Sequence, residues 1–254
     1  MHVVNSSHII TKFSIMKQKK NIVFYIYLIF AAITISPAIL LAQSNGIVDK
    51  IWNAVGGKNK WETTKYIMFT VSGNSKYPSI SGNRKFLLDK QTGNVRFEGT
   101  LNNENVVALL NVQNQKLNHV YDENGAEMAL QTFKELLPDL IAQYNIDLKV
   151  LSLPITIMAS NISSQTSSKI INAEKLQKLD FSNFLGNSGS FYVSEESGLV
   201  KRLDIDNKSY LVNGYKDIGN GLILPTTFKG SSDSITYQKV ASFTEMEPEK
   251  FKAF

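Results

Sequence analysis

The side chains that most often carry catalysis are scarce in this chain. The sequence has no cysteine and three histidines, and only His119 lies beyond the first 42 residues. Without thiols and with a single imidazole, zinc sites and nucleophile–base pairs lack their usual components. His119 stands in a predicted strand beside Val120 and Tyr121, and we interpret it as a surface or interstrand residue. We therefore expect no metal site and no cofactor.

Acidic residues form three small clusters, Asp122-Glu123, Glu195-Glu196 and Asp204 with Asp206. Two carboxylates suffice for glycoside hydrolysis when they face each other across a cleft. Each cluster, however, adjoins a predicted turn or alternates with apolar residues, which is typical of a solvated face. The glycines fall in predicted hairpin turns and do not form the pattern of a phosphate-binding loop. The sequence predicts a protein that is not an enzyme, and a hydrolase built on two converging acids is a minor alternative.

The elements that position these residues are mostly strands. Between Tyr210 and Lys229, two arms reverse at Gly219-Asn220-Gly221, as in a tight hairpin turn, and Pro225 suggests an edge or a bulge. Alternating apolar residues predict further strands over residues 65–73, 84–89, 95–98, 106–112, 117–121, 169–181, 190–194, 199–206 and 235–243. This succession is typical of an antiparallel meander.

Helical spacing occurs twice. Apolar residues over 47–55 predict a helix that ends at Gly56-Gly57, and residues 133–144 predict an amphipathic helix that Pro138 kinks or divides. Residues 146–158 are strongly apolar, and their periodicity does not distinguish helix from strand. Residues 161–168 are polar and are interpreted as a connection.

The N-terminal region carries a targeting signal. Three lysines precede an apolar run over residues 22–35, and a proline and small residues follow it. This pattern predicts a secretory signal peptide over residues 1–42, with Met16 as the true start and cleavage after Ala42. An uncleaved anchor helix is the alternative, because residues 22–42 are long enough to span a bilayer. We expect residues 43–254 to form a single domain.

The charge balance depends on this signal. The first 42 residues contain four of the 27 basic residues and none of the 22 acidic ones, so the remainder has a net charge of +1. Nucleic-acid binding requires a concentrated basic face. We therefore expect no nucleic-acid partner.

Three segments resemble one known family. They are GNVRFEG from Gly93 to Gly99, ESGLVKRLDI from Glu196 to Ile205, and NGYKDIGNGLILPTTF from Asn213 to Phe228. Together with the order of elements, they are similar to the LolA-like family of periplasmic carriers, in the version common in Bacteroidetes-type bacteria. These carriers are related to the outer-membrane lipoprotein-sorting protein.

The resemblance implies an α+β fold in which a strongly curved antiparallel sheet, an incomplete β-barrel, has helices across its concave face. An apolar cavity between sheet and helices would receive acyl chains. Residues 133–144 and 146–158 would form the helical lid, and an arginine on an early strand would hold it closed. Arg96 matches that arginine best and Arg84 is a second candidate, although a plain surface arginine is the simpler reading of Arg96. The ligand-binding residues implied are Phe69, Val71, Phe86, Leu88, Phe97, Val107, Leu109, Phe133, Leu137, Leu140 and Ile141, for each of which simple core packing is the alternative.

The function implied is a periplasmic, monomeric carrier or chaperone for lipoprotein acyl chains or another hydrophobic ligand. Its partners would include envelope proteins of the inner and outer membranes. The alternative is a non-catalytic envelope interaction module with a filled core and a partner-binding edge near Pro225.

Overall fold

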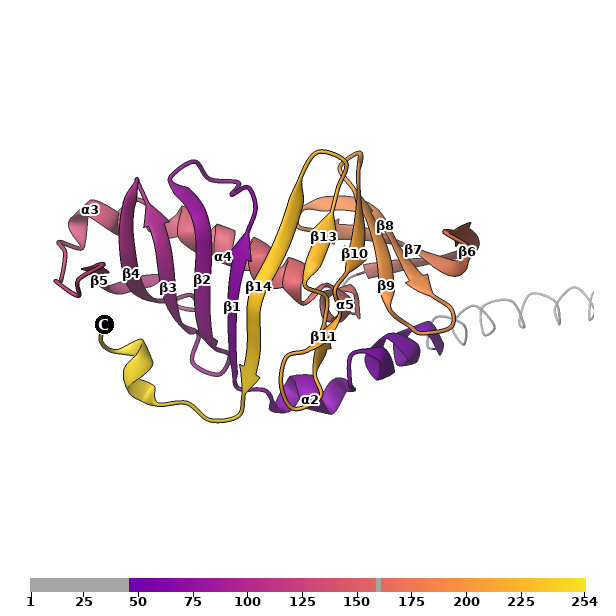
Figure 1. The fold of residues 1–254 in the computed structure, drawn as a ribbon, viewed down its shortest axis with the longest axis horizontal. Helices are drawn as coiled ribbons and strands as arrows, with labels where there is room; N and C mark the ends of the chain where they lie inside the picture. Colours follow the sequence, from indigo (N-terminus) through magenta and orange to yellow (C-terminus); the bar gives the residue numbers. More distant parts are fainter. Residues whose placement is uncertain (1–45, 159–160) are drawn as a thin grey trace, which may run out of the picture. The chain divides into compact units, whose positions relative to one another are not determined.

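The computed structural model describes residues 46–158 and 161–254, and residues 47–254 form one compact unit. Its main feature is a twelve-stranded antiparallel sheet with the order β5-β4-β3-β2-β1-β14-β13-β10-β9-β8-β7-β6 (Figure 1). The strands are β1 (Tyr66–Ser72), β2 (Ile80–Asp89), β3 (Asn94–Leu101), β4 (Glu104–Asn111), β5 (Lys116–Asp122), β6 (Asn161–Ile171), β7 (Glu174–Phe184), β8 (Asn187–Ser194), β9 (Val200–Ile205), β10 (Lys208–Asn213), β13 (Thr227–Lys229) and β14 (Ser234–Phe243). The fold class is α+β, as the sequence predicts, and the sheet is an incomplete barrel because its end strands β5 and β6 do not pair with each other.

The helices follow from this topology. The chain leaves the sheet at β5 and re-enters it at β6, which is the opposite end of the strand order. The intervening helices α3 (Gln131–Lys134), α4 (Leu137–Leu151) and α5 (Leu153–Met158) must therefore cross a face of the sheet, and α4 passes behind β2, β1 and β14 (Figure 1). We call the face that α4 covers the inner face and the opposite one the outer face. The other helices are residues 46–54, α2 (Lys58–Thr63) and the 3-10 helix η1 (Pro248–Phe251).

Aromatic rings fill the space between α4 and the inner face. The ring of Phe86 lies 5.3 Å from that of Phe69, 5.2 Å from that of Phe97 and 5.5 Å from that of Tyr144 on α4. All four side chains are buried. Buried aromatic side chains contribute strongly to core energetics, so this cluster fixes α4 against the sheet.

Local patterns predict most elements correctly, and the structure settles or revises three further regions. Residues 146–158, which periodicity leaves open, are helical because α4 and α5 lie on the apolar inner face. Residues 161–168 are not a connection but belong to β6, whose backbone pairs with β7. A turn at Asn172 and Ala173, both with positive φ, divides the single strand expected over residues 169–181.

The region near Pro225 is also organised differently from the expectation. The turn at 219–221 closes a small separate hairpin of β11 (Lys216–Asp217) and β12 (Ile223–Leu224). Pro225 is buried, and the following strand β13 pairs with both β10 and β14. The expected partner-binding edge near Pro225 is therefore absent from the main sheet, whose end strands are β5 and β6.

Two adjacent glycines after the first helix provide a test of backbone strain. Gly56 and Gly57 have φ of 96° and 99°, but a Cβ on Gly56 would collide with the carbonyl oxygen of Gly221, whereas Gly57 has open space. Gly57 has ψ of 150°, a backbone conformation that is essentially restricted to glycine and costs other residues about 1–3 kcal/mol. We expect Gly57→Ala to lower the free energy of unfolding by about that amount and Gly56→Ala to lower it further, as measured by urea denaturation. Equal losses of unfolding free energy in the two variants would mean that the close packing of Gly56 against the carbonyl oxygen of Gly221 does not stabilise the fold.

The sequence also raises the question of a membrane-spanning helix and of an N-terminal signal. Within residues 46–158 and 161–254, no helix is both long enough and apolar enough to cross a bilayer. The predicted signal peptide, its cleavage site and the predicted start at Met16 lie outside the described residues.

Candidate functional site

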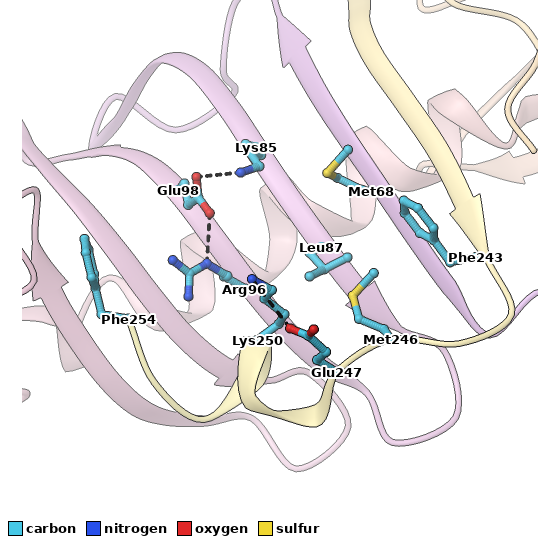
Figure 2. A pocket seen from close by; sticks show the side chains of 10 residues that line it. All are labelled: Met68, Lys85, Leu87, Arg96, Glu98, Phe243, Met246, Glu247, Lys250 and Phe254. Carbon is cyan, nitrogen blue, oxygen red and sulfur yellow. Dashed lines mark hydrogen bonds and ion pairs between the residues drawn. The ribbon is translucent and has the colours of Figure 1, made fainter.

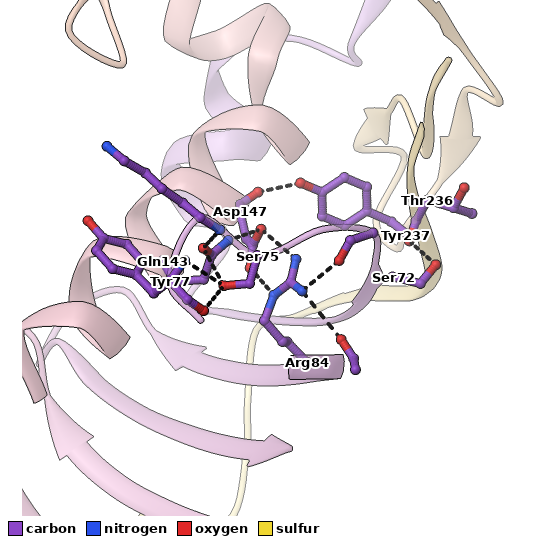
Figure 3. A network of polar contacts seen from close by, with 11 residues as sticks. Ser72, Ser75, Tyr77, Arg84, Gln143, Asp147, Thr236 and Tyr237 are labelled. Carbon is purple, nitrogen blue, oxygen red and sulfur yellow. Dashed lines mark hydrogen bonds and ion pairs between the residues drawn. The ribbon is translucent and has the colours of Figure 1, made fainter. Parts of the chain in front are cut away.

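A buried ion pair joins α4 to the inner face of the sheet. Arg84 of β2 donates from Nε to Asp147 Oδ2 at 2.8 Å and from Nη2 to Asp147 Oδ1 at 3.2 Å (Figure 3). Their side chains are only 1% and 3% exposed. Such a bidentate guanidinium–carboxylate pair is both strong and geometrically specific. It fixes the position of α4 along its own axis as well as its distance from the sheet.

Ordinary strand alternation brings Arg84 to this face. Arg84 lies two residues before Phe86 and four before Leu88, which both join the inner core, and it pairs with Val71 of β1 in an unbroken register. The register between β2 and β3 shifts between Ser81 and Lys85, and Gly82 within that stretch has φ of 67°. Arg84 Nη1 also donates to the carbonyl oxygens of Gly73 at 3.0 Å and Gly82 at 3.3 Å, so the guanidinium is held from both sides.

Further hydrogen bonds surround the ion pair. Gln143, one helical turn before Asp147 on the same face of α4, donates from Nε2 to Asp147 Oδ1 at 2.9 Å. Its Oε1 accepts from Ser75 Oγ at 3.0 Å and from the backbone N–H of Lys76 at 2.9 Å. Tyr237 of β14 donates from its hydroxyl to the backbone carbonyl of Asp147 at 2.6 Å. We call Arg84, Asp147, Gln143, Ser75 and Tyr237 the α4 latch.

The electrostatics of the latch follow from its burial. Desolvation raises the pKa of the Asp147 carboxyl above its ordinary value, while the hydrogen bonds and charge of Arg84 and the hydrogen bond of Gln143 oppose this shift. Desolvation likewise raises the pKa of Tyr237 far above its ordinary range, so its hydroxyl stays a donor. These groups therefore hold α4 in place and offer no free base or nucleophile.

A hollow of about 700 Å³ lies beside the latch. Its walls are the loop between β1 and β2, the 142–149 face of α4, and the turns that follow β7, β9 and β13. Gln143 and Asp147 line it, so the latch lies at its wall. A second lining carboxylate, Asp233, is bound by Lys208 Nζ and by the Tyr210 hydroxyl, each at 3.1 Å. Both of these carboxylates thus have cationic or hydroxyl partners inside the protein.

Most of the predicted ligand-binding residues come together on the inner face and under the helices. Phe69, Val71, Phe86, Leu88 and Phe97 of the sheet are at most 4% exposed, as are Phe133 and Leu140 of the helices, while Leu137 and Ile141 are half-buried and pack against the same core. None of them lines the hollow beside the latch. Their side chains pack against one another in the core.

Val107, Leu109 and Arg96 lie on the outer face instead. In β4 the residues that join the inner core are Val106, Ala108 and Leu110, so the alternate positions 107 and 109 face the other way. Every residue from Val106 to Leu110 is buried, which is why apolar character alone does not distinguish the two faces. Val107 and Leu109 are therefore removed from the predicted cavity.

Arg96 is likewise corrected as the residue that contacts the lid. Its Nε donates to Glu98 Oε1 and its Nη1 to the carbonyl oxygen of Ala253, both at 2.8 Å. The second candidate, Arg84, makes the contact with α4. Side chains alternate along β3, so Arg96 lies on the opposite face of the sheet from its neighbour Phe97. This alternation was sufficient to distinguish the two arginines.

Sequence reasoning did not single out Asp147 and Gln143. Their i, i+4 spacing within an otherwise apolar segment was a usable signal, because a buried carboxylate there requires a cationic partner. The predicted surface position of His119 agrees with the structure. His119 is on the surface of β5 with Nδ1 2.7 Å from Glu127 Oε1. No group of three metal-ligating side chains occurs within residues 46–158 and 161–254.

Comparison with known proteins gives the following likenesses. No family model matches the sequence, and no curated protein matches it. A DUF1329 family protein from Desulfovibrio piger is 12% identical with a TM-score of 0.41, over 82% of this chain and 96% of that one. The lipoprotein LppX of Mycobacterium tuberculosis is 10% identical with a TM-score of 0.31, over 80% and 97%. MucB is 9% identical with a TM-score of 0.28, over 84% of this chain and 63% of that one.

Proposed function

We propose that this protein is an exported envelope carrier that shelters an acyl chain, or another hydrophobic ligand, between the inner face of its sheet and α4. The observation that carries the proposal is the α4 latch. Replacing a buried ion pair by apolar residues is often neutral or stabilising, so a buried pair adds little to a permanently packed helix. It does provide a specific contact that can break and re-form, which suits a helix that opens and closes.

The chemistry under α4 fits such a ligand. The surface that an opened α4 would expose is apolar and aromatic, with Phe69, Phe86 and Phe97 at its centre. Burial of each methylene is worth about 0.8 kcal/mol, so an acyl chain would bind there without an ion pair of its own. The residues that resemble the LolA-like family support the same reading. We further propose that the protein acts as a monomer and is exported by the predicted signal peptide over residues 1–42.

We propose a binding function rather than catalysis. Three carboxylates line the hollow. Asp147 is occupied by Arg84 and Gln143, and Asp233 by Lys208 and Tyr210, while Asp206 is exposed in the turn after β9. Two residues of the acidic clusters in the sequence are engaged in ion pairs at the surface. Asp204 pairs with Arg202, and Glu195 with Lys175. A carboxylate that acts as acid or base must be within reach of its substrate.

One observation favours a second candidate, a non-catalytic interaction module of the envelope on the same scaffold. The inner face is closed by side chains, as it would be if the core were permanently filled. In that case the protein would use its surface, not its interior, to bind partners.

A titration distinguishes these candidates. Delipidated protein is titrated with an uncharged fluorescent acyl alcohol, for which the carrier predicts saturable binding. Leu137→Glu, which places a charge on the half-buried face of α4, should weaken binding at least about tenfold, because a buried charge without a partner is costly. Leu211→Glu on β10, where the leucine is 41% exposed, is the matched control and should bind as the unmodified protein does. Absence of saturable binding would reject the carrier and leave the interaction module.

A further inference from the structure

The outer face of the sheet carries a second hollow, which α4 does not touch. Its floor consists of Met68, Leu87 and Phe243, from β1, β2 and β14. The chain after β14 folds back over these strands, and Met246 and Phe254 of this segment form its wall (Figure 2). The volume is about 510 Å³, which lies within the range of small-molecule sites.

The segment that forms the wall is attached to the sheet at several points. The ring of Phe251 stacks on that of Tyr66 at 6.1 Å, and Arg96 Nη1 donates to the carbonyl oxygen of Ala253 at 2.8 Å. The ring of Phe254 lies 6.0 Å from that of Tyr121. These contacts hold the segment over the strands and leave the hollow between them.

Among the charged side chains that line this hollow, the positive ones outnumber the negative ones. Lys85 Nζ and Arg96 Nε each lie 2.8 Å from an oxygen of Glu98, so two cations share one carboxylate. Partial burial by itself raises the pKa of Glu98, but the hydrogen bonds and charges of Lys85 and Arg96 outweigh it and lower that pKa below its ordinary value. Glu98 is thus ionised at neutral pH and balances only one of the two cations.

Arg96 also has unused hydrogen-bonding capacity. Its Nε and one N–H of Nη1 are engaged, whereas Nη2 has no partner within the described part of the chain. The side chain is only 14% exposed, so the free donors are partly desolvated and strongly favour an anion. On the other side of the hollow, Lys250 and Glu247 lie 3.9 Å apart and cancel each other's charge.

We propose that this hollow binds a single-chain amphiphile with one anionic head group, such as a fatty acid. The carboxylate contacts Arg96 and Lys85, and the chain lies along Met68, Leu87, Phe243 and Met246. Methionine side chains are flexible and polarisable, so the two methionines adapt to chains of different shape. The site is independent of the proposed carrier site, because it lies on the opposite face of the sheet and requires a charge on the ligand.

The experiment is photo-cross-linking of the purified protein with a diazirine-bearing palmitic acid, followed by mass spectrometric mapping of the adducts. The same probe as its methyl ester tests the need for charge. The proposal predicts adducts of the acid on the peptides that contain Leu87 or Met246, and about tenfold fewer with the ester. Arg96→Gln should reduce these adducts about tenfold.

Arg202→Gln is the matched control. Arg202 lies on β9 and pairs with Asp204 two residues on, as Arg96 pairs with Glu98, but it does not line the hollow. This variant should label as strongly as the unmodified protein. If Arg96→Gln does not fold, as judged by its circular dichroism, Met246→Glu on the C-terminal segment is used in its place. It should also reduce the adducts, because its carboxylate repels the head group and its polarity disrupts the wall.

The outcomes separate the two sites. Adducts of the acid confined to peptides of α4 and the inner face would overturn this proposal while supporting the carrier. Equal labelling of the hollow by acid and ester, or no effect of Arg96→Gln and Met246→Glu, would also overturn it. Labelling of the hollow alone would support it even if the carrier site failed its own test.

Discussion

Replacement of Arg84 by methionine should lower the free energy of unfolding by about 3–5 kcal/mol, as measured by urea denaturation. Arg84 and Asp147 are almost completely buried, so the substitution leaves a carboxylate with neither water nor a cation beside it. It also removes the donor to the carbonyl oxygens of Gly73 and Gly82. Arg202→Met is the matched control, because that arginine is 26% exposed in its pair with Asp204 and should cost less than about 1 kcal/mol.

Two further measurements show whether the loss comes from the unpaired charge. The double variant Arg84→Met/Asp147→Leu should be more stable than Arg84→Met, because it removes the carboxylate as well. In Arg84→Met, desolvation of Asp147 acts without an opposing cation and raises its pKa further. A raised carboxyl pKa means that the folded state binds protons more tightly, so stability is greatest at low pH and is lost as the pH rises through that pKa. The deficit of Arg84→Met should therefore shrink on acidification. A loss as small as that of Arg202→Met would mean that the pair does not hold α4.

Phe86→Ala should also destabilise the protein by about 3–5 kcal/mol, because it leaves a cavity in the aromatic cluster between sheet and α4. Under the proposed function this cavity lies where the ligand binds. An uncharged acyl alcohol should therefore bind Phe86→Ala more tightly than the unmodified protein. At a ligand concentration of about one hundred times Kd, binding would restore roughly 2.7 kcal/mol, visible as an increase in the melting temperature.

Phe191→Ala is the control for this substitution. Phe191 is fully buried in a second cluster of aromatic rings within the same core, with its ring 4.2 Å from that of Phe181 and 5.6 Å from that of Phe184. The loss of stability should be similar, but the acyl alcohol should not restore it, because this cluster has no ring contact with α4 among the described residues. Equal recovery of both variants would show that the probe fills any apolar cavity, and would count against a dedicated site under α4.

Much of the fold was predictable because it depends on local chemistry. Alternation of apolar residues in β1 and β14, the glycines after the first helix, and Pro138 at the start of α4 each act within a few residues. Such signals survive in the folded protein because neighbouring residues along the chain determine backbone geometry there. The expectation about catalysis came from composition alone, since a sequence without cysteine and with one histidine beyond its first 42 residues has few of the usual catalytic side chains.

What only the tertiary structure decided is which face each residue joins and which partner it meets. Val107 and Leu109 are as apolar as their neighbours in β4 and are buried like them, so hydrophobicity did not reveal which face they join. Residues 146–158 became helical because the chain must pass from β5 to β6 across the inner face. The partner that Arg84 meets on α4 is a carboxylate 63 residues away. Pairing across that distance depends on how the sheet and α4 pack together, and no short stretch of sequence encodes it.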